Sequence, residues 1–199
     1  MPKIVDYDKR REWIIDGYLG LVQSNFPGPA TSRNLAKHLG ISNSLLWRYF
    51  DGMDDLLAQV YLTVVERTNR RISESISLRH GMDAVKAMLD ELLPLTDESR
   101  VESQVVVAFW GRSATSPTNT ASVGLTEMNV WTTLMARLVE DAVNLGQIRV
   151  SENVSMSDLA ELLVSSATSV QIEYAIRRDA KIVKRRRELM TSFFLPEVA

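Results

Sequence analysis

Apolar residues recur three and four positions apart along almost the entire chain of 199 residues. This spacing gathers them on one face of an α-helix. Runs that alternate apolar and polar residues, as half-buried strands do, are missing from the sequence. The pattern therefore predicts an all-α protein.

Glycines and prolines divide this pattern into about nine helices, since proline interrupts a helix and glycine readily ends one. The first helix is predicted to begin near Asp6 or Asp8 and to run to about Asn25, before Pro27. The other predicted helices are 32–39, 42–50, 54–77, 82–93, 98–115, 122–145, 156–177 and 179–195. We interpret residues 1–52 as a three-helix module, joined by a long fourth helix to a helical body within residues 53–199.

Several classes of protein are excluded by composition and motif. The chain has no cysteine, so disulfides, thiolate metal sites and a cysteine nucleophile are excluded. His38 and His80 have no partners at metal-ligand spacing, and neither a Gly-x-Ser-x-Gly motif nor a glycine-rich phosphate loop occurs. We therefore expect no metal, no cofactor and no enzymatic activity.

The N-terminus and the hydropathy of the chain bear on its location. The first residues, MPKIVDYDKRREW, are charged and lack the apolar core of a secretory signal. No window approaches the ~20 apolar residues that a membrane span needs. We expect a cytoplasmic protein without a membrane partner.

Charge is distributed unevenly between the two parts of the chain. The net charge is −2, but residues 1–50 hold seven lysines and arginines against four acids, or +3, which leaves −5 for the remainder. A mildly basic N-terminal module thus precedes an acidic body. This asymmetry alone does not identify a nucleic-acid partner.

Residues 31–50, TSRNLAKHLGISNSLLWRYF, have the proportions of a helix-turn-helix. Thr31 or Ser32 caps the first helix and Ser42 caps the second, while Gly40 makes the turn. In the second helix, Leu46 and Phe50 form an apolar face. The opposite face carries Asn43, Ser44, Trp47 and Arg48, with Leu45 and Tyr49 at its margins. A DNA recognition helix needs this division, but similar helix pairs also occur in proteins that do not bind DNA.

Residues 11–57, REWIIDGYLGLVQSNFPGPATSRNLAKHLGISNSLLWRYFDGMDDLL, resemble the N-terminal domain of TetR-type transcriptional regulators. The shared order is an amphipathic helix, Thr-x-x-x-Leu-Ala, Leu-Gly-Ile-Ser, x-x-Leu-aromatic-x-Tyr-Phe and a closing Leu-Leu. The opening Met-Pro-Lys-Ile-Val-Asp, the Leu-Leu-Pro-Leu near residue 94 and the Ala-Phe-Trp at 108–110 are similar to the BetI-like branch.

This resemblance implies a homodimer that binds a palindromic double-stranded DNA operator and a small-molecule effector, which releases it as a repressor. The last two helices, about 156–195, would form the dimer interface. Arg33 would lie at the groove edge, and Trp47 and Tyr49 match phosphate-contacting aromatics. The implied DNA-binding residues are Thr31, Ser32, Arg33, Ser42, Asn43, Ser44, Leu45, Trp47, Arg48 and Tyr49.

The sequence departs from the family pattern near the start of the fourth helix. Met53 stands where a lysine is usual, and Asp51, Asp54 and Asp55 surround it. Without this lysine one phosphate contact is lost, which predicts weaker DNA binding. Arg48 or the basic run at residues 9–11 would offset the loss. Alternatively, the basic run is only a solvated helix face. A second hypothesis follows: a helical small-molecule-binding or interaction protein with a weakened DNA-binding module.

The body contains a concentration of aromatic residues and methionines. These side chains either fill an ordinary core or line a pocket for the effector. A BetI-like branch suggests a small cation such as choline, for which an aromatic cage is the natural receptor. The candidate ligand-binding residues are Met88, Phe109, Trp110, Met128, Trp131, Met135 and Tyr174.

Overall fold

The computed structural model describes residues 7–24, 28–115, 120–151 and 153–195, and these ranges are dominated by α-helix. The helices are α1 (Tyr7–Gln23), α2 (Ser32–Leu39), α3 (Asn43–Leu46), α4 (Met53–Ile76), α5 (Gly81–Leu92), α6 (Asp97–Thr115), α7 (Thr120–Asn144), α8 (Met156–Arg177) and α9 (Ala180–Phe194). The all-α prediction is confirmed. Within the described ranges, none of the helices is long and apolar enough to cross a membrane.

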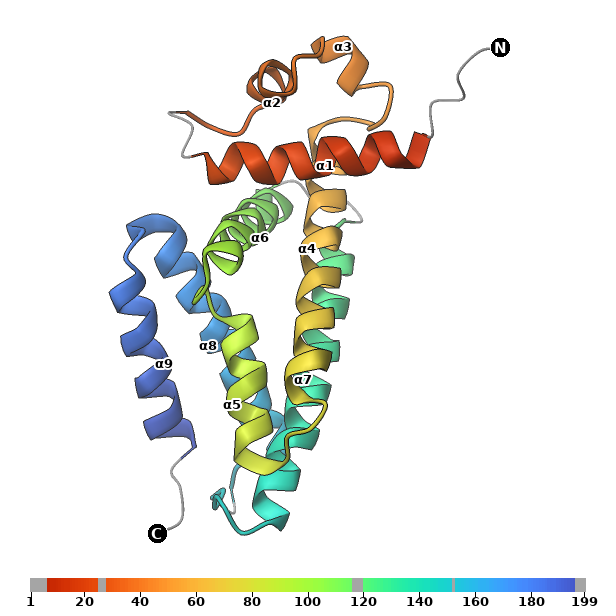
Figure 1. Ribbon diagram of the computed structural model, residues 1–199. Coiled ribbons are helices and arrows are strands. Elements are labelled where there is room, and N and C mark those ends of the chain that lie inside the picture. Colours follow the sequence, from red (N-terminus) through yellow and green to blue (C-terminus); the bar gives the residue numbers. More distant parts are fainter. Residues whose placement is uncertain (1–6, 25–27, 116–119, 152, 196–199) are drawn as a thin grey trace.

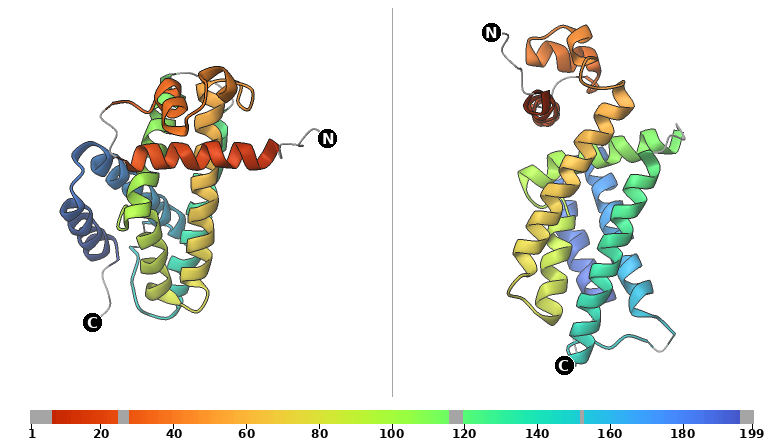
Figure 2. Two further views of the ribbon diagram at one scale, coloured as in Figure 1. Left: turned by 45° about the horizontal axis from the view of Figure 1, so that its top comes forward. Right: turned by 90° about the vertical axis from the view of Figure 1, so that its right-hand side faces the viewer.

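The three N-terminal helices lie at one end of an elongated bundle (Figure 1). Helix α1 crosses the ends of α4 and α6, and α2 and α3 pack on its other side (Figure 2). Helix α4 runs from this end along the length of the body, where it packs against α5, α6 and α7. Helices α8 and α9 form the opposite side of the bundle.

The observed helices agree with the predicted ranges within a few residues, with one exception. The predicted helix 42–50 is wrong in length, because α3 ends at Leu46 and a turn continues to Phe50. In this turn the N–H of Arg48 donates to the carbonyl of Leu45, three residues earlier, at 3.2 Å. The chain therefore tightens toward 3₁₀ geometry. Asp6, Asn25 and Pro27, which were expected near the ends of the first helix, lie outside the described residues.

Two clusters of buried apolar side chains hold the molecule together. The first cluster joins α1, α2, α3 and the N-terminal half of α4 to Val105 and Phe109 of α6. The second cluster joins α5, α7, α8 and α9, and includes Ile72 from the C-terminal half of α4. Trp131 of α7 packs against both clusters. Helix α4 and Trp131 thus connect the N-terminal helices with the body.

Helix α1 contacts its neighbours through one apolar face. Ile14, Tyr18 and Leu21 are buried, whereas Trp13 is 38% exposed and lies beneath the guanidinium of Arg10. At Gly17 a Cβ atom would lie 2.3 Å from Cδ2 of Leu39. Glycine therefore permits the close crossing of α1 and α2.

Candidate nucleic-acid interface and effector region

Side-chain caps define the two helices of the helix-turn-helix. Oγ1 of Thr31 accepts the N–H of Asn34 at 3.3 Å, and Oγ of Ser42 accepts the N–H of Leu45 at 3.2 Å. Gly40 takes the left-handed conformation, with φ 66°, at the end of α2. These contacts satisfy N–H groups that a helix start leaves unpaired. They assign the α2 cap to Thr31 and leave Ser32 inside the first turn.

The α2–α3 unit has one buried and one accessible face. Leu35, Leu46 and Phe50 are buried in the first cluster. The residues predicted to contact DNA divide into two sets. Thr31, Arg33, Ser42, Asn43, Ser44 and Arg48 are exposed, whereas Ser32, Leu45, Trp47 and Tyr49 are half-buried. The polar side chains of the first set are thus free to meet a partner outside the protein.

Two residues of α1 hold the segment that follows α3. Arg11 donates from Nη1 to the carbonyl of Tyr49, and its guanidinium lies 4.6 Å from the ring of Phe50. The hydroxyl of Tyr7 approaches the carbonyls of Arg48 and Tyr49 at 3.4 and 3.5 Å, and its ring lies 5.1 Å from that of Tyr49. Sequence reasoning missed this role, although the spacing of Tyr7 and Arg11 places both on one helical face. In this structure the guanidinium of Arg11 contacts Tyr49 and Phe50 of the same chain.

The acidic residues at the start of α4 also have structural partners. Asp54 forms an ion pair with Arg112 of α6, and Oδ2 of Asp55 accepts the N–H of Asp51 at 3.0 Å. Met53 is half-buried against the first cluster. Carboxylates are favourable in the first turn of a helix. Two of the three acids near the expected DNA surface are therefore engaged within the protein.

An aromatic group lies where α4, α6 and α7 meet. The rings of Tyr61 and Phe109 stack with centroids 4.0 Å apart, and Trp110 meets both edge-on. The indole N–H of Trp131 donates to Asn69 at 2.6 Å. Aromatic groups of this kind present apolar surface together with π-faces.

Glu127 of α7 adds a negative charge beside this aromatic group. Asn69 donates from Nδ2 to Oε2 of Glu127 at 3.5 Å. Burial chiefly, and the charge of Glu127 in addition, raises the pKa of Tyr61 well above its usual value. The phenol consequently stays neutral.

The predicted ligand-binding residues do not all lie together. Phe109, Trp110 and Trp131 belong to or pack against the first cluster. Met88 and Met135 are fully buried in the second cluster, and Met128 is half-buried on α7. Tyr174 lies instead near the end of α8, beside the C-terminal end of α1. The structure therefore separates Tyr174 from the aromatic group.

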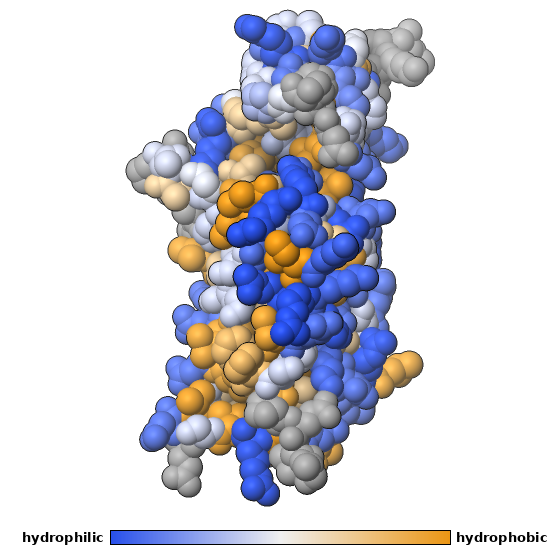
Figure 3. Space-filling model, turned by 90° about the vertical axis from the view of Figure 1, so that its left-hand side faces the viewer, coloured by the Kyte–Doolittle hydropathy of each residue, from blue (hydrophilic) through white to orange (hydrophobic). Residues whose placement is uncertain are grey.

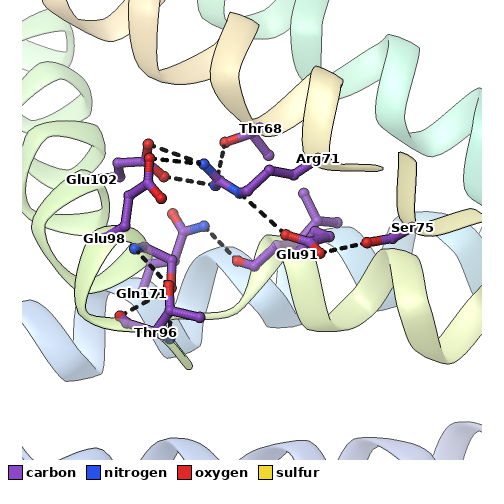
Figure 4. A network of polar contacts seen from close by, with 10 residues as sticks. Thr68, Arg71, Ser75, Glu91, Thr96, Glu98, Glu102 and Gln171 are labelled. Atoms are coloured by element: carbon purple, nitrogen blue, oxygen red, sulfur yellow. Dashed lines mark hydrogen bonds and ion pairs between the residues drawn. The ribbon is translucent and has the colours of Figure 1, made fainter. Parts of the chain in front are cut away.

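A network of charged side chains connects α4, α5 and α6 (Figure 4). The guanidinium of Arg71 donates to Glu102 at 2.7 and 3.2 Å and to Glu91 at 3.2 Å, while Glu98 lies 3.6 Å away. Only 5% of the Glu102 side chain is exposed. Burial raises the pKa of this carboxyl, and the hydrogen bonds from Arg71 oppose the shift. Glu102 is thus the buried member of the network, and a buried charge is costly unless it is paired.

Comparison with known proteins finds relatives among transcriptional regulators. Residues 81–166 match the C-terminal domain of BetI-type transcriptional repressors. Over 111 residues the chain is 33% identical to the HTH-type transcriptional regulator PksA of Bacillus subtilis. Over these parts of its length the chain is similar to TetR-type transcriptional regulators. The alignment with PksA spans 55% of this chain and 54% of PksA, about half of each.

Solved structures share the fold of this chain. A transcriptional regulator from Saccharomonospora viridis, solved in complex with choline, has a TM-score of 0.81 at 17% identity and covers 96% of this chain and 99% of its own. A regulator from Rhodococcus sp. Rha1 has a TM-score of 0.74 at 22% identity, with 93% and 95% covered. These matches agree with the predicted resemblance to TetR-type transcriptional regulators.

Proposed function

We propose that this chain is a TetR-type regulator, a homodimeric repressor that binds a palindromic operator and is released by a small-molecule effector. Residues 1–52 contact DNA, and residues 53–199 bind the effector and dimerise. The protein works in the cytoplasm, where its DNA partner lies. One observation carries the proposal: the polar face of α2 and α3 is exposed, while the opposite, apolar face of the same two helices is buried.

The details of this face favour DNA over the alternative of a helical small-molecule-binding protein with a weakened DNA-binding module. Arg33, Asn43 and Arg48 are exposed together with three hydroxyl-bearing neighbours. Arginine and asparagine are the side chains that most often read base edges in the major groove. The acids that motivated the alternative are partly neutralised, since Asp54 pairs with Arg112 and Asp55 caps a turn.

Selection of binding sites from a random duplex pool, followed by affinity measurements over a range of salt, tests DNA recognition. Arg33→Ala should weaken binding to the selected site about tenfold or more. Arg137→Ala, which changes an exposed arginine on α7, serves as the control. Tyr49 is less suitable for substitution because it packs on Tyr7. A dimer that enriches no sequence over random duplex would refute the proposal.

The face formed by α8 and α9 supports the homodimer. Leu162, Ile172 and Ile176 follow helical spacing along α8, and they are 49%, 43% and 75% exposed. Beside them, Phe193 of α9 is 75% exposed at a largely apolar groove of about 600 Å³ between the two helices. Figure 3 shows apolar patches among charged side chains on this side of the molecule. Apolar patches rimmed by polar residues are typical of subunit interfaces.

The mass of the particle in solution tests this interface. We expect light scattering to give twice the chain mass of 22.4 kDa. Ile176→Asp should shift the protein to monomer, because it buries a carboxylate between two copies. Leu78→Asp is the matched control, since Leu78 is 92% exposed in the turn after α4. Equal dimerisation of both variants would contradict the proposed interface.

The aromatic group in the body supports a small organic cation as effector. Tyr61, Phe109 and Trp110 supply π-faces and edges, and Glu127 supplies a compensating negative charge. Aromatic side chains together with a carboxylate favour quaternary ammonium groups. The regulator from Saccharomonospora viridis with the same fold was solved with choline. We infer that the effector of this chain belongs to the same chemical class.

Calorimetry with choline and with its neutral isostere 3,3-dimethyl-1-butanol tests the effector class. We expect choline to bind, to lower operator affinity, and to bind Glu127→Gln about tenfold more weakly. Glu140→Gln, on an exposed position of α7, should bind choline as the unmodified protein does. If the neutral isostere binds as tightly as choline, the effector is not a cation.

A further inference from the structure

A groove lies where the DNA-binding helices meet the body. It consists of two cavities of about 370 and 380 Å³ that share Val22, Gln104 and Arg178 in their walls. The C-terminal half of α1 and residues 28–30 form one side, and α6 and the end of α8 form the other. Figure 1 shows the C-terminal end of α1 above the turn that joins α8 to α9.

Arg178 stands in this groove in an unusual backbone conformation. It caps α8 with φ 56° and is the sole described residue other than glycine with a positive φ. Its N–H donates to the carbonyl of Tyr174 at 2.8 Å, a contact that glycine would make without strain. A residue other than glycine is strained in the left-handed conformation. The backbone alone therefore gives no reason for an arginine.

The side chain of Arg178 also has no partner within the described ranges. Across the described residues, its guanidinium forms no ion pair and no hydrogen bond, whereas the neighbouring Arg177 pairs with Glu173 at 3.4 Å. The other cation of the groove, Arg100, is neutralised by Asp97 at 2.7 Å and also donates to the carbonyl of Leu95. Among the residues that the structure describes, Arg178 is thus the cation of these walls without an acidic partner.

The rest of the groove is suited to a ligand with a polar head and a short apolar part. Leu21, Val22 and Val101 provide apolar wall on α1 and α6. Burial raises the pKa of Tyr18, so its phenol stays protonated and can donate a hydrogen bond. The volumes lie within the range of small-molecule sites.

We propose that this groove binds a small organic monocarboxylate, with the carboxylate on the guanidinium of Arg178 and the apolar part against α1 and α6. The planar guanidinium matches a carboxylate with two parallel hydrogen bonds. A phosphate monoester, with nearly two charges, would need a second free cation, and Arg100 is already paired.

The position of the groove couples ligand binding to the orientation of the DNA-binding helices relative to the body. Its walls come from the DNA-binding helices and from the body, so any movement between them changes the shape of the site. Binding and orientation are then linked thermodynamically. This site is separate from the aromatic group that we assign to the cationic effector, and it does not depend on that assignment.

Three probes of equal chain length, hexanoate, hexanol and hexylammonium, test the proposal with the full-length protein. Calorimetry should detect binding of hexanoate alone. Methyl resonances of Leu21, Val22 and Val101 should shift with hexanoate, while those of Val139 in the second cluster stay unchanged. Failure of hexanoate to bind, or equal binding of hexylammonium, would overturn the proposal and leave the choline experiment unaffected.

Variants at the end of α8 test whether hexanoate binding depends on the side chain of Arg178. Arg178→Gly removes the guanidinium and relieves the backbone, so its melting temperature should not fall while hexanoate binding weakens about tenfold or more. Arg178→Lys keeps the charge without the planar fork and should give intermediate affinity. Arg177→Ala is the control with unchanged binding. If Arg178→Gly binds hexanoate as the unmodified protein does, Arg178 is not the anion receptor.

Discussion

Replacing Arg71 with methionine removes the guanidinium from the centre of the network between α4, α5 and α6. Only 5% of the Glu102 side chain is exposed, so its carboxylate stays largely removed from water. In the variant this carboxylate also loses the two hydrogen bonds that Arg71 donates to it. Glu91 retains the hydroxyl of Ser75 at 2.6 Å. Glu102 is therefore the group that determines the cost of the substitution.

The magnitude follows from burial. Removing one partner of a buried ion pair costs about 3–5 kcal/mol. Because 21% of the Arg71 side chain is exposed, water can partly replace it, and we expect about 2–3 kcal/mol. For a chain of this length that corresponds to a fall in melting temperature of about 5–10 °C.

The pH dependence carries a definite sign. The folded-state pKa of Glu102 is already raised, so its contribution to stability is fully present below the unfolded pKa and is lost as pH rises through the folded pKa. Arg71 opposes this shift, so Arg71→Met raises that pKa further. The variant should lose more stability at about pH 8 than at about pH 5.

Thermal and urea unfolding at fixed protein concentration measure these differences, with Glu102→Gln and the double variant completing the cycle. We expect Glu102→Gln to cost less than Arg71→Met and to recover part of the loss when the two are combined. If the two single substitutions cost the same and add in the double variant, burial of Glu102 does not govern the network.

Further predictions concern packing and capping. At Gly124 a Cβ atom would lie 2.6 Å from the ring of Trp110 and 3.0 Å from that of Phe109, so Gly124→Ala should cost about 1–3 kcal/mol and change tryptophan fluorescence. Thr31→Ala removes the α2 cap and should cost about 1 kcal/mol in urea unfolding, more than Ser32→Ala. Hydrogen bonds from Ser155 lower the pKa of Asp158. The ionised carboxylate of Asp158 therefore stabilises the folded state above the unfolded-state pKa, and this stabilisation is lost as pH falls through the folded-state pKa. Acid titration of Asp158→Asn should therefore show a weaker dependence of stability on pH.

Much of the fold follows from local signals in the sequence. Helix ranges, the caps at Thr31 and Ser42, and the turn at Gly40 depend on residues within a few positions of one another, and the structure confirms them. The burial of Leu46 and Phe50 follows from the same helical spacing. The length of α3 was not predictable in this way, because periodicity does not distinguish an α-turn from the 3₁₀-like turn at residues 47–49.

Contacts between distant segments account for most of what sequence reasoning missed. Arg11 looked like a free basic residue, but it binds the carbonyl of Tyr49 across 38 positions. Asp54 looked like part of an acidic surface, but it pairs with Arg112 across 58 positions. Tyr174 shares its aromatic character with the effector candidates, yet its helix ends beside α1. Composition and periodicity carry no information on such pairings.

The passage of α4 through both hydrophobic clusters has a practical consequence for protein engineering. Leu56, Val60 and Val64 complete the cluster beneath α1–α3, and Ile72 belongs to the cluster of the body. A fragment cut after residue 52 would leave much of its apolar surface open to water. Chimeras that exchange the DNA-binding part between relatives should therefore be joined inside α4, after Val65, and they should retain the α6 residues Val105 and Phe109 that seal the same cluster.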